Sequence, residues 1–222
     1  MSERKFHPET LAVHAGWNGD PATHACAVPV YRTTAYNFDN AQYGADLFAL
    51  RKPGNIYARL MNPTEDVLEQ RLAALEGGAA ALTLASGTAA IYFTVTNIAE
   101  TGSNFVSADN VYGGTYVQFN TILKQSNGIE VKWTHLNDFA AVEAAIDEKT
   151  RFVYVETIGN PTLGVADIKS TRRSRTSTGF RSSWTPRSRR RFSSIRSSGV
   201  RTLSSTRSRS GSADTARALA VW

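Results

Sequence analysis

The 222-residue sequence predicts an α/β fold with a mostly parallel sheet and helices on both faces. Two observations lead to this prediction. Short apolar runs alternate with amphipathic stretches from about residue 64 to residue 156, and small or glycine-rich loops follow several of those runs. Alternating strands and helices are typical of right-handed βαβ units, whose strands run parallel.

The elements begin after a loop-rich stretch, residues 1–50, which starts with a polar arm. Within this stretch, Val28–Thr34 is expected to be extended, because a residue that precedes proline avoids the helical region. Thr64–Leu75 is predicted to be an amphipathic helix with Thr64 as its cap, ended by Gly77-Gly78. The next apolar run, Ala79–Ala85, is predicted to be a buried strand.

The remaining elements alternate between helix and strand. They are a helix over Ala89–Ala99, a strand over Asn104–Ser107, a helix over Gly114–Leu123, a strand over Glu130–Thr134, a helix over Phe139–Ile146 and a strand over Arg151–Glu156. Ligands of parallel sheets bind beyond the carboxyl ends of the strands. We therefore expect a site formed by the loops Ser86–Thr88, Asn110–Gly114 and Glu156–Pro161.

Two of these loops have residues that suit a flat, phosphorylated ligand. The small residues Ser86, Gly87 and Thr88 would let backbone N–H groups approach an anion, and a helix start adds about half a positive charge. Tyr112 beside Gly113-Gly114 could stack on a heteroaromatic ring. The simpler alternatives are a tight turn capped by Ser86 and a tyrosine that packs beside a turn.

Polar side chains elsewhere could complete such a site. Tyr57 and Arg59 would point the same way if their segment is extended, and could together grip one phosphate. Glu156 and Asn160 follow the last predicted strand and could face the crevice. The alternatives are a surface ion pair for Arg59 and a turn at Asn160 before Pro161.

The order and spacing of these motifs resemble the Cys/Met-metabolism family of fold-type I pyridoxal-phosphate (PLP) enzymes. The resemblance covers residues 6–169. It rests on Tyr57-x-Arg59, Asn62-Pro63-Thr64, Leu75–Gly78, Ser86–Ala90, Tyr112–Thr115 and Glu156–Pro161. Within the family, His14–Gly16, Leu47–Leu50 and Gly54–Tyr57 are most similar to the O-acetylhomoserine sulfhydrylases.

The resemblance implies a domain organisation and roles for single residues. Residues 1–60 would be an arm that contacts another subunit, and 61–169 the incomplete large PLP domain of a fold-type I transferase. The turn Ser86-Gly87-Thr88 would bind the PLP phosphate, and Tyr112 would stack on the PLP ring and act in acid–base catalysis. Asn160 would lie near the ring hydroxyl and the substrate carboxylate. Tyr57 and Arg59 would reach the phosphate of a neighbouring subunit in a dimer of dimers.

The activity implied by the resemblance is a PLP-dependent γ-replacement. O-acetylhomoserine would react with sulfide or a thiol to give homocysteine in methionine biosynthesis, with cystathionine γ-synthase or methionine γ-lyase chemistry as alternatives. No metal is expected, because His7, His14, His24 and His135 lack metal-ligand spacing.

Other features favour a cytoplasmic protein that does not insert into a membrane. The start of the chain has no signal-peptide pattern, and no apolar stretch approaches membrane length. The single cysteine, Cys26, cannot form an internal disulfide and is expected to be partly buried.

Residues 170–222 break the family pattern. They hold 13 Arg, 15 Ser, no Lys and one acidic residue, a net charge of +12, whereas residues 1–169 hold 12 basic and 18 acidic residues, a net charge of −6. The lysine that would bind PLP covalently in the family is therefore missing. Either this tail is an Arg/Ser-rich segment that binds nucleic acid, or it is a frameshifted translation of the family's continuation.

The frameshift interpretation makes a specific match, and we prefer it to a nucleic-acid partner. When each hidden codon starts at the third base of a written codon, Ser177–Pro186 can encode His-Gly-Ile-Pro-Phe-Val-Val-Asp-Ala, the family's strand with its pyridine-binding Asp. In the same frame, Gly199–Trp222 can encode a segment whose lysine codon lies across Arg209 and Ser210. We therefore expect a disordered tail, unpaired sheet edges and a chain that folds poorly and does not catalyse.

Overall fold

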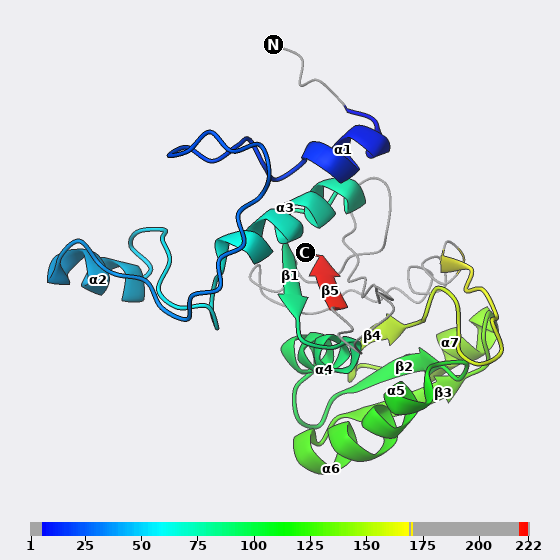
Figure 1. The fold of residues 1–222 in the computed structure, drawn as a ribbon. Helices are drawn as coiled ribbons and strands as arrows, with labels where there is room; N and C mark the ends of the chain where they lie inside the picture. Colours follow the sequence, from blue (N-terminus) through cyan, green and yellow to red (C-terminus); the bar gives the residue numbers. More distant parts are fainter. Residues whose placement is uncertain (1–5, 169, 171–217, 222) are drawn as a thin grey trace. The chain divides into compact units, whose positions relative to one another are not determined.

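The computed structural model describes residues 6–168, Ser170 and the backbone of β5 (Ala218–Val221) (Figure 1). Residues 170–222 were expected to be disordered and to leave the chain inactive. These residues lie largely outside the described range. By its contacts the chain divides into two units, Met1–Thr83 with Val221 and Leu84–Ala220 with Trp222.

The first unit contains three helices and the start of a strand. They are α1 (Pro8–His14), α2 (Ala41–Phe48), α3 (Pro63–Glu76) and β1 (Ala81–Leu84), which ends one residue into the second unit. The sequence had suggested only loops where α1 and α2 lie. Both helices are short, and α2 is started by Asn40, whose side chain accepts a hydrogen bond from the N–H of Tyr43.

Close backbone approach joins α1 to α3. Arg71 Nε donates to the carbonyl of Ala15 at 2.9 Å, and a Cβ added at Gly16 would lie 2.7 Å from the carbonyl oxygen of Val67. Gly16 also has a φ of +76°, which favours glycine. The turn after α1 therefore depends on glycine both for its conformation and for space.

The start of α3 differs from the prediction. Asn62, and not Thr64, is the cap, because its side chain accepts from the N–H of Thr64 and leaves Pro63 in the first turn. The Thr64 hydroxyl instead donates to the carbonyl of Pro29 and accepts from the N–H of Tyr31, both at 2.9 Å. Asn62-Pro63-Thr64 thus starts the helix and also ties down Val28–Thr34, which lies outside any helix or strand.

Cys26 is exposed, which corrects the expectation of partial burial. Its backbone carbonyl, rather than its thiol, makes the local contact, because the indole N–H of Trp17 donates to it at 2.8 Å. Tethering through the backbone leaves the side chain outside the packed part of the unit.

The second unit alternates helices and strands, as the sequence predicted. Its elements are α4 (Gly87–Ile98), β2 (Asn104–Ala108), α5 (Gly113–Val117), η1 (Gln118–Leu123), α6 (Lys124–Asn127), β3 (Glu130–Thr134), α7 (Phe139–Ala145) and β4 (Thr150–Tyr154). Figure 1 shows α5, η1 and α6 as one continuous helix, with η1 a π-helical stretch at its centre.

The sheet of this unit has the order β3-β2-β4, and both ladders are parallel. The α/β prediction with a parallel sheet is therefore confirmed. All five residues of the central strand β2 are buried, as expected for a strand with neighbours on both edges. Because the strands are parallel, the loops after β2 and β4 leave the sheet at the same edge.

Aromatic packing holds the helices against the sheet. The ring of Phe105 in β2 stacks on that of Phe152 in β4 at 4.7 Å and meets Phe119 of η1 edge-to-face at 4.8 Å. All three side chains belong to one buried cluster with Val95, Ala99, Leu123 and Ile129. This core fixes the helix that follows Tyr112 against the strand that precedes Glu156.

Among the described residues, no helix has the length and apolar character needed to cross a membrane. The same residues contain no group of three or more His, Cys, Asp or Glu side chains arranged to hold a metal ion.

Candidate cofactor site

The start of α4 presents free space in front of a helix N-terminus. Ser86 is the cap, its hydroxyl oxygen accepting from the N–H of Ala89 at 3.1 Å. The N–H groups of Gly87 and Thr88 come first in the helix and have no acceptor one turn earlier. A Cβ built at Gly87 would meet no atom within 4 Å among the described residues outside its own helix and chain neighbours. The predicted cap at Ser86 is therefore present, and the turn can still receive an anion.

A glutamine that the sequence analysis did not single out supports this turn. Gln118 of η1 is only 5% exposed, and its Nε2 donates to the carbonyl oxygen of Thr88 at 3.1 Å. Its Oε1 is buried and accepts no hydrogen bond from any described residue. No particular signal in the sequence marked it, because the predicted helix Gly114–Leu123 also contains the polar residues Thr115, Asn120 and Thr121. The bond joins α4 to the helix that begins beside Tyr112.

Tyr112 is the N-cap residue of α5, and its side chain is 44% exposed. Its ring lies against the backbone of Gly114. A Cβ at Gly114 would sit 2.5 Å from Cε1 and 3.1 Å from Cδ1 of the ring. Glycine at this position therefore makes room for the tyrosine, and the ring keeps an accessible surface on which a flat ligand could stack.

Glu156 connects the end of β4 to this tyrosine. One carboxylate oxygen accepts from the N–H of Tyr112 at 3.1 Å, and the other accepts from the hydroxyl of buried Thr115 at 3.2 Å and from that of Tyr154 at 3.5 Å. Burial raises the pKa of Glu156, and the hydrogen bond from Tyr112 opposes that rise. Burial, followed by the nearby Glu156 carboxylate, raises the pKa of Tyr154 as well. The sequence had marked Glu156 only as a side chain that could face the crevice.

Asn160 lies in the loop after β4 and is exposed. Its peptide bond to Pro161 is cis, and the N–H of Gly159 donates to the carbonyl of Gly164 at 2.9 Å. A side chain at Gly159 would overlap Asn110, so the loops after β2 and β4 touch. Asn160 therefore belongs to the same edge of the sheet as Tyr112 and Glu156.

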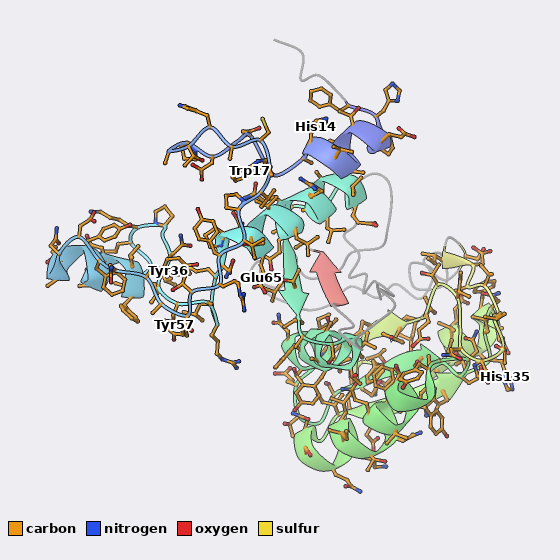
Figure 2. The ribbon with its side chains drawn as sticks, in the orientation of Figure 1. His14, Trp17, Tyr36, Tyr57, Glu65 and His135 are labelled. Carbon is orange, nitrogen blue, oxygen red and sulfur yellow. The ribbon has the colours of Figure 1, made fainter. Side chains whose placement is uncertain are left out.

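Tyr57 and Arg59 lie in the first unit, and their expected geometry is wrong. The segment is not extended after Tyr57, because the carbonyl of Tyr57 accepts from the N–H groups of Leu60 and Met61 and closes a turn. The two side chains therefore do not share a face by strand alternation. Both are exposed, and Figure 2 shows Tyr57 beside Tyr36 in the first unit.

The described lysines of the second unit lie away from this edge. Lys124 pairs with Glu130, the first residue of β3, at 3.3 Å. Lys132 pairs at 2.6 Å with Asp147, which precedes β4, and Lys149 immediately precedes β4. Each is therefore held near the amino ends of the strands. Among the described residues of the second unit, no lysine reaches the loops with Tyr112 and Asn160.

Comparison with known proteins agrees with the fold. The Cys/Met metabolism PLP-dependent enzyme family matches residues 9–180. O-acetyl-L-homoserine sulfhydrylase 1 of Thermus thermophilus is 51% identical over 163 residues, covering 73% of this chain and 38% of that protein. Homocysteine synthase of Schizosaccharomyces pombe is 48% identical over 169 residues, covering 76% and 39%. The chain thus spans less than two fifths of the length of these relatives.

Solved structures show the same similarity. A Campylobacter jejuni protein assigned as an O-acetylhomoserine (thiol)-lyase, crystallised with N'-pyridoxyl-lysine-5'-monophosphate, has a TM-score of 0.74 at 40% identity, covering 78% of this chain and 43% of that one. Cystathionine gamma-lyase of Lactobacillus plantarum in complex with L-serine has a TM-score of 0.68 at 32% identity, covering 78% and 42%.

The fold and the site define part of the large domain of a fold-type I PLP-dependent enzyme. The chain belongs to the Cys/Met metabolism PLP-dependent enzyme family. Its residues fit the cofactor in two respects, since the space before Gly87 suits a phosphate and the accessible ring of Tyr112 suits a pyridine ring. The covalent attachment has no counterpart among the described residues.

Proposed function

We propose that this chain carries the phosphate-binding and ring-binding part of an enzyme that performs γ-replacement on O-acetylhomoserine with sulfide or a thiol. The observation that carries the proposal is the combination, within one unit, of an accessible tyrosine ring and an open helix start on a chain of a PLP-dependent family. Bound PLP would supply an acceptor for the electrons released at the substrate.

The residues of the chain would act as follows. The N–H groups of Gly87 and Thr88 would hold the phosphate at the positive end of α4, while Ser86 keeps that helix start in shape. Tyr112 would stack on the ring and exchange a proton with the substrate. Asn160 would donate hydrogen bonds to the ring hydroxyl and the substrate carboxylate from the loop after β4.

The substrate assignment rests on the relatives. The names of the Thermus and Schizosaccharomyces proteins describe O-acetylhomoserine sulfhydrylase and homocysteine synthase activities, at 51% and 48% identity. The match to a cystathionine gamma-lyase supports related γ-carbon chemistry as the second candidate. In both cases the substrate amine and leaving group would react in the crevice at the carboxyl ends of the strands.

We further propose that the 222-residue chain itself does not catalyse. Residues 170–222 contain no lysine, and the described lysines of the second unit lie at the other end of the sheet. A shifted reading frame after Lys169 would restore both the Asp that pairs with the pyridine nitrogen and the PLP-binding lysine. The restored protein would act in the cytoplasm as a homo-oligomer, with Tyr57 and Arg59 contributing to a neighbouring subunit's phosphate site.

The test compares two proteins, the 222-residue chain and the same gene read in the shifted frame after the codon of Lys169. Each is mixed with PLP and assayed for covalently bound cofactor by visible absorbance and for homocysteine formation from O-acetylhomoserine and sulfide. We expect both signals only from the frame-shifted protein. Homocysteine formation by the 222-residue chain would overturn the inactivity, and cystathionine formation with cysteine in place of sulfide would favour the second candidate.

A further inference from the structure

We propose that Glu156 is a positioning residue for Tyr112: its carboxylate holds the backbone of this tyrosine and thereby sets the direction of the ring. The inference deepens the proposed function and rests on it for the ring's role in cofactor binding. It assigns a task to a side chain that does not itself touch the cofactor.

The two carboxylate oxygens of Glu156 accept hydrogen bonds from two residues at the start of one helix. One accepts from the N–H of Tyr112 at 3.1 Å, and the other accepts from the hydroxyl of Thr115 at 3.2 Å. Tyr112 caps α5 without any side-chain hydrogen bond of its own to that helix. Glu156 therefore supplies, from the end of β4, an acceptor for the N–H of the N-cap residue, the bond that the glutamate of a capping box makes within one helix.

The direction of the Tyr112 ring is restricted by the same contacts. Once the N–H of Tyr112 is fixed, the ring can only leave the backbone in a few staggered directions. It occupies the direction over Gly114, where a Cβ would sit 2.5 Å from its Cε1 atom. The Glu156 carboxylate fixes the backbone from which the Tyr112 side chain extends, and the missing side chain at Gly114 leaves room for the ring in one direction. Together they present the accessible surface of the ring in one orientation.

The charge of Glu156 favours a role in positioning Tyr112 over a role in stability alone. Burial penalises the charge of Glu156, so a half-buried carboxylate is a costly way to hold a loop. Glutamine would nearly match its size but offers only one acceptor oxygen to the three donors, which are the N–H of Tyr112 and the hydroxyls of Thr115 and Tyr154. Both oxygens of the charged Glu156 carboxylate accept hydrogen bonds at this helix start, one from the N–H of Tyr112 and one from the hydroxyl of buried Thr115.

The first arm of the test needs no ligand. Amide hydrogen exchange is followed by mass spectrometry over residues 109–116 in the full chain, in Glu156→Gln and in Glu156→Ala. Losing a hydrogen bond to a charged group should speed exchange at Tyr112 about tenfold. The first turn of α4 should keep its rate. Unchanged exchange over residues 109–116 in both variants overturns the proposal.

The matched control is Glu148→Gln, because Glu148 lies before the same strand and its exposed carboxylate makes no contact on which Tyr112 depends. We expect its exchange pattern to equal that of the parent. A milder variant, Thr115→Val, keeps the charge and the bond to Tyr112 while removing one donor, so its exchange should change less than that of Glu156→Gln. Equal acceleration by Glu148→Gln and Glu156→Gln would overturn the specific role of Glu156.

The second arm uses two probes, pyridoxine 5'-phosphate and inorganic phosphate. Pyridoxine 5'-phosphate has the ring and the phosphate but no aldehyde, so it needs no lysine. Glu156→Gln should weaken its binding about tenfold, as the ring loses its fixed partner, and should leave inorganic phosphate within about twofold. Equal weakening of both probes would show a merely structural role and overturn the proposal. If the parent chain binds neither probe, the cofactor-binding proposal fails, while the exchange arm still decides the role of Glu156.

Discussion

At the scale of single residues, the candidate site depends on two glycines with opposite surroundings. Gly87 faces open space, whereas Gly114 is covered by the ring of Tyr112. Neither has a positive φ, so the need for glycine is spatial rather than conformational. At Gly87 the absent side chain leaves room for a ligand, and at Gly114 it leaves room for a side chain of the protein itself.

Gly87→Ala should separate binding from stability. Beyond its own helix and chain neighbours, the new methyl group meets no atom of the described residues within 4 Å, and alanine in a helix favours folding by about 0.5–1 kcal/mol over glycine. We expect the melting temperature to stay equal or rise, while affinity for inorganic phosphate falls because the methyl group occupies the space before the helix start. Thermal unfolding and phosphate titration measure the two effects. Unchanged phosphate affinity would place the anion elsewhere.

Two substitutions of Gln118, one apolar and one charged, are expected to differ in their effect on stability. Its Nε2 bond to Thr88 stabilises the turn by about 1 kcal/mol, but its buried Oε1 lacks a described partner and costs a similar amount. Gln118→Leu should therefore leave the melting temperature nearly unchanged. Gln118→Glu buries a charge beside the carbonyl of Thr88 and should destabilise by about 1–3 kcal/mol. A larger loss with leucine than with glutamate would contradict this account.

At the scale of elements, the sheet of the second unit is fastened at the edge opposite the site. Asp147 accepts from Asn104 at the start of β2 and from Lys132 of β3, and Thr150 at the start of β4 donates to Asn104 at 2.7 Å. The hydrogen bond from Lys132 holds the pKa of Asp147 well below its usual range. Since Thr150 also donates to Asp147 at 3.0 Å, one carboxylate joins the starts of β2 and β4 to the centre of β3.

The lowered pKa of Asp147 gives a signed pH dependence. Its stabilisation is present above the ordinary carboxyl pKa of about 4 and is lost as the pH falls toward the folded-state pKa. Asp147→Asn should cost about 1 kcal/mol at pH 7, a modest value because the ion pair is partly exposed. The difference from the parent should shrink below about pH 4.

Urea unfolding at a series of pH values measures that difference. Glu148→Gln, a change at the exposed neighbouring carboxylate, should show no such trend. Glu156 contributes with the opposite sign, since a raised carboxyl pKa favours the folded state at low pH and this contribution is lost as the pH rises through the folded pKa. A gap between Asp147→Asn and the parent that stays constant down to about pH 2 would refute the assignment.

The elements show what the sequence could and could not predict. In the second unit, apolar residues of α4, β2, η1 and β4 pack in one core. Periodicity located α3, β1, α4, β2, β3, α7 and β4, but it ended the helix of α5 and η1 at Leu123, before α6. It missed α1 and α2, which are short and start from local caps and a proline. It identified Tyr112 from its glycine neighbours, but Glu156 and Gln118 gain their roles from partners at sequence separations of 44 and 30, which local patterns do not reveal.

At the scale of the whole molecule, charge divides the chain in a way that the fold alone does not explain. Residues 1–169 carry a net charge of −6 and residues 170–222 carry +12. The family match and the candidate site belong almost wholly to the acidic part. A shifted frame accounts for the basic part without giving it a function, whereas a nucleic-acid-binding tail requires that this charge be used.

Salt dependence distinguishes these two accounts. Any binding of duplex DNA by the 222-residue chain should be carried by the arginines of residues 170–222. Its affinity should fall with salt by about 0.9 logarithmic units per phosphate neutralised for each tenfold rise in salt. A chain ending at Lys169 should not bind DNA, because its net charge is −6. Fluorescence anisotropy at several salt concentrations, with DNA of two unrelated sequences, measures both effects. Equal affinity for the two sequences would mark the charge as unspecific and favour the shifted frame, whereas a preference for one sequence that persists at high salt would favour an evolved nucleic-acid-binding segment.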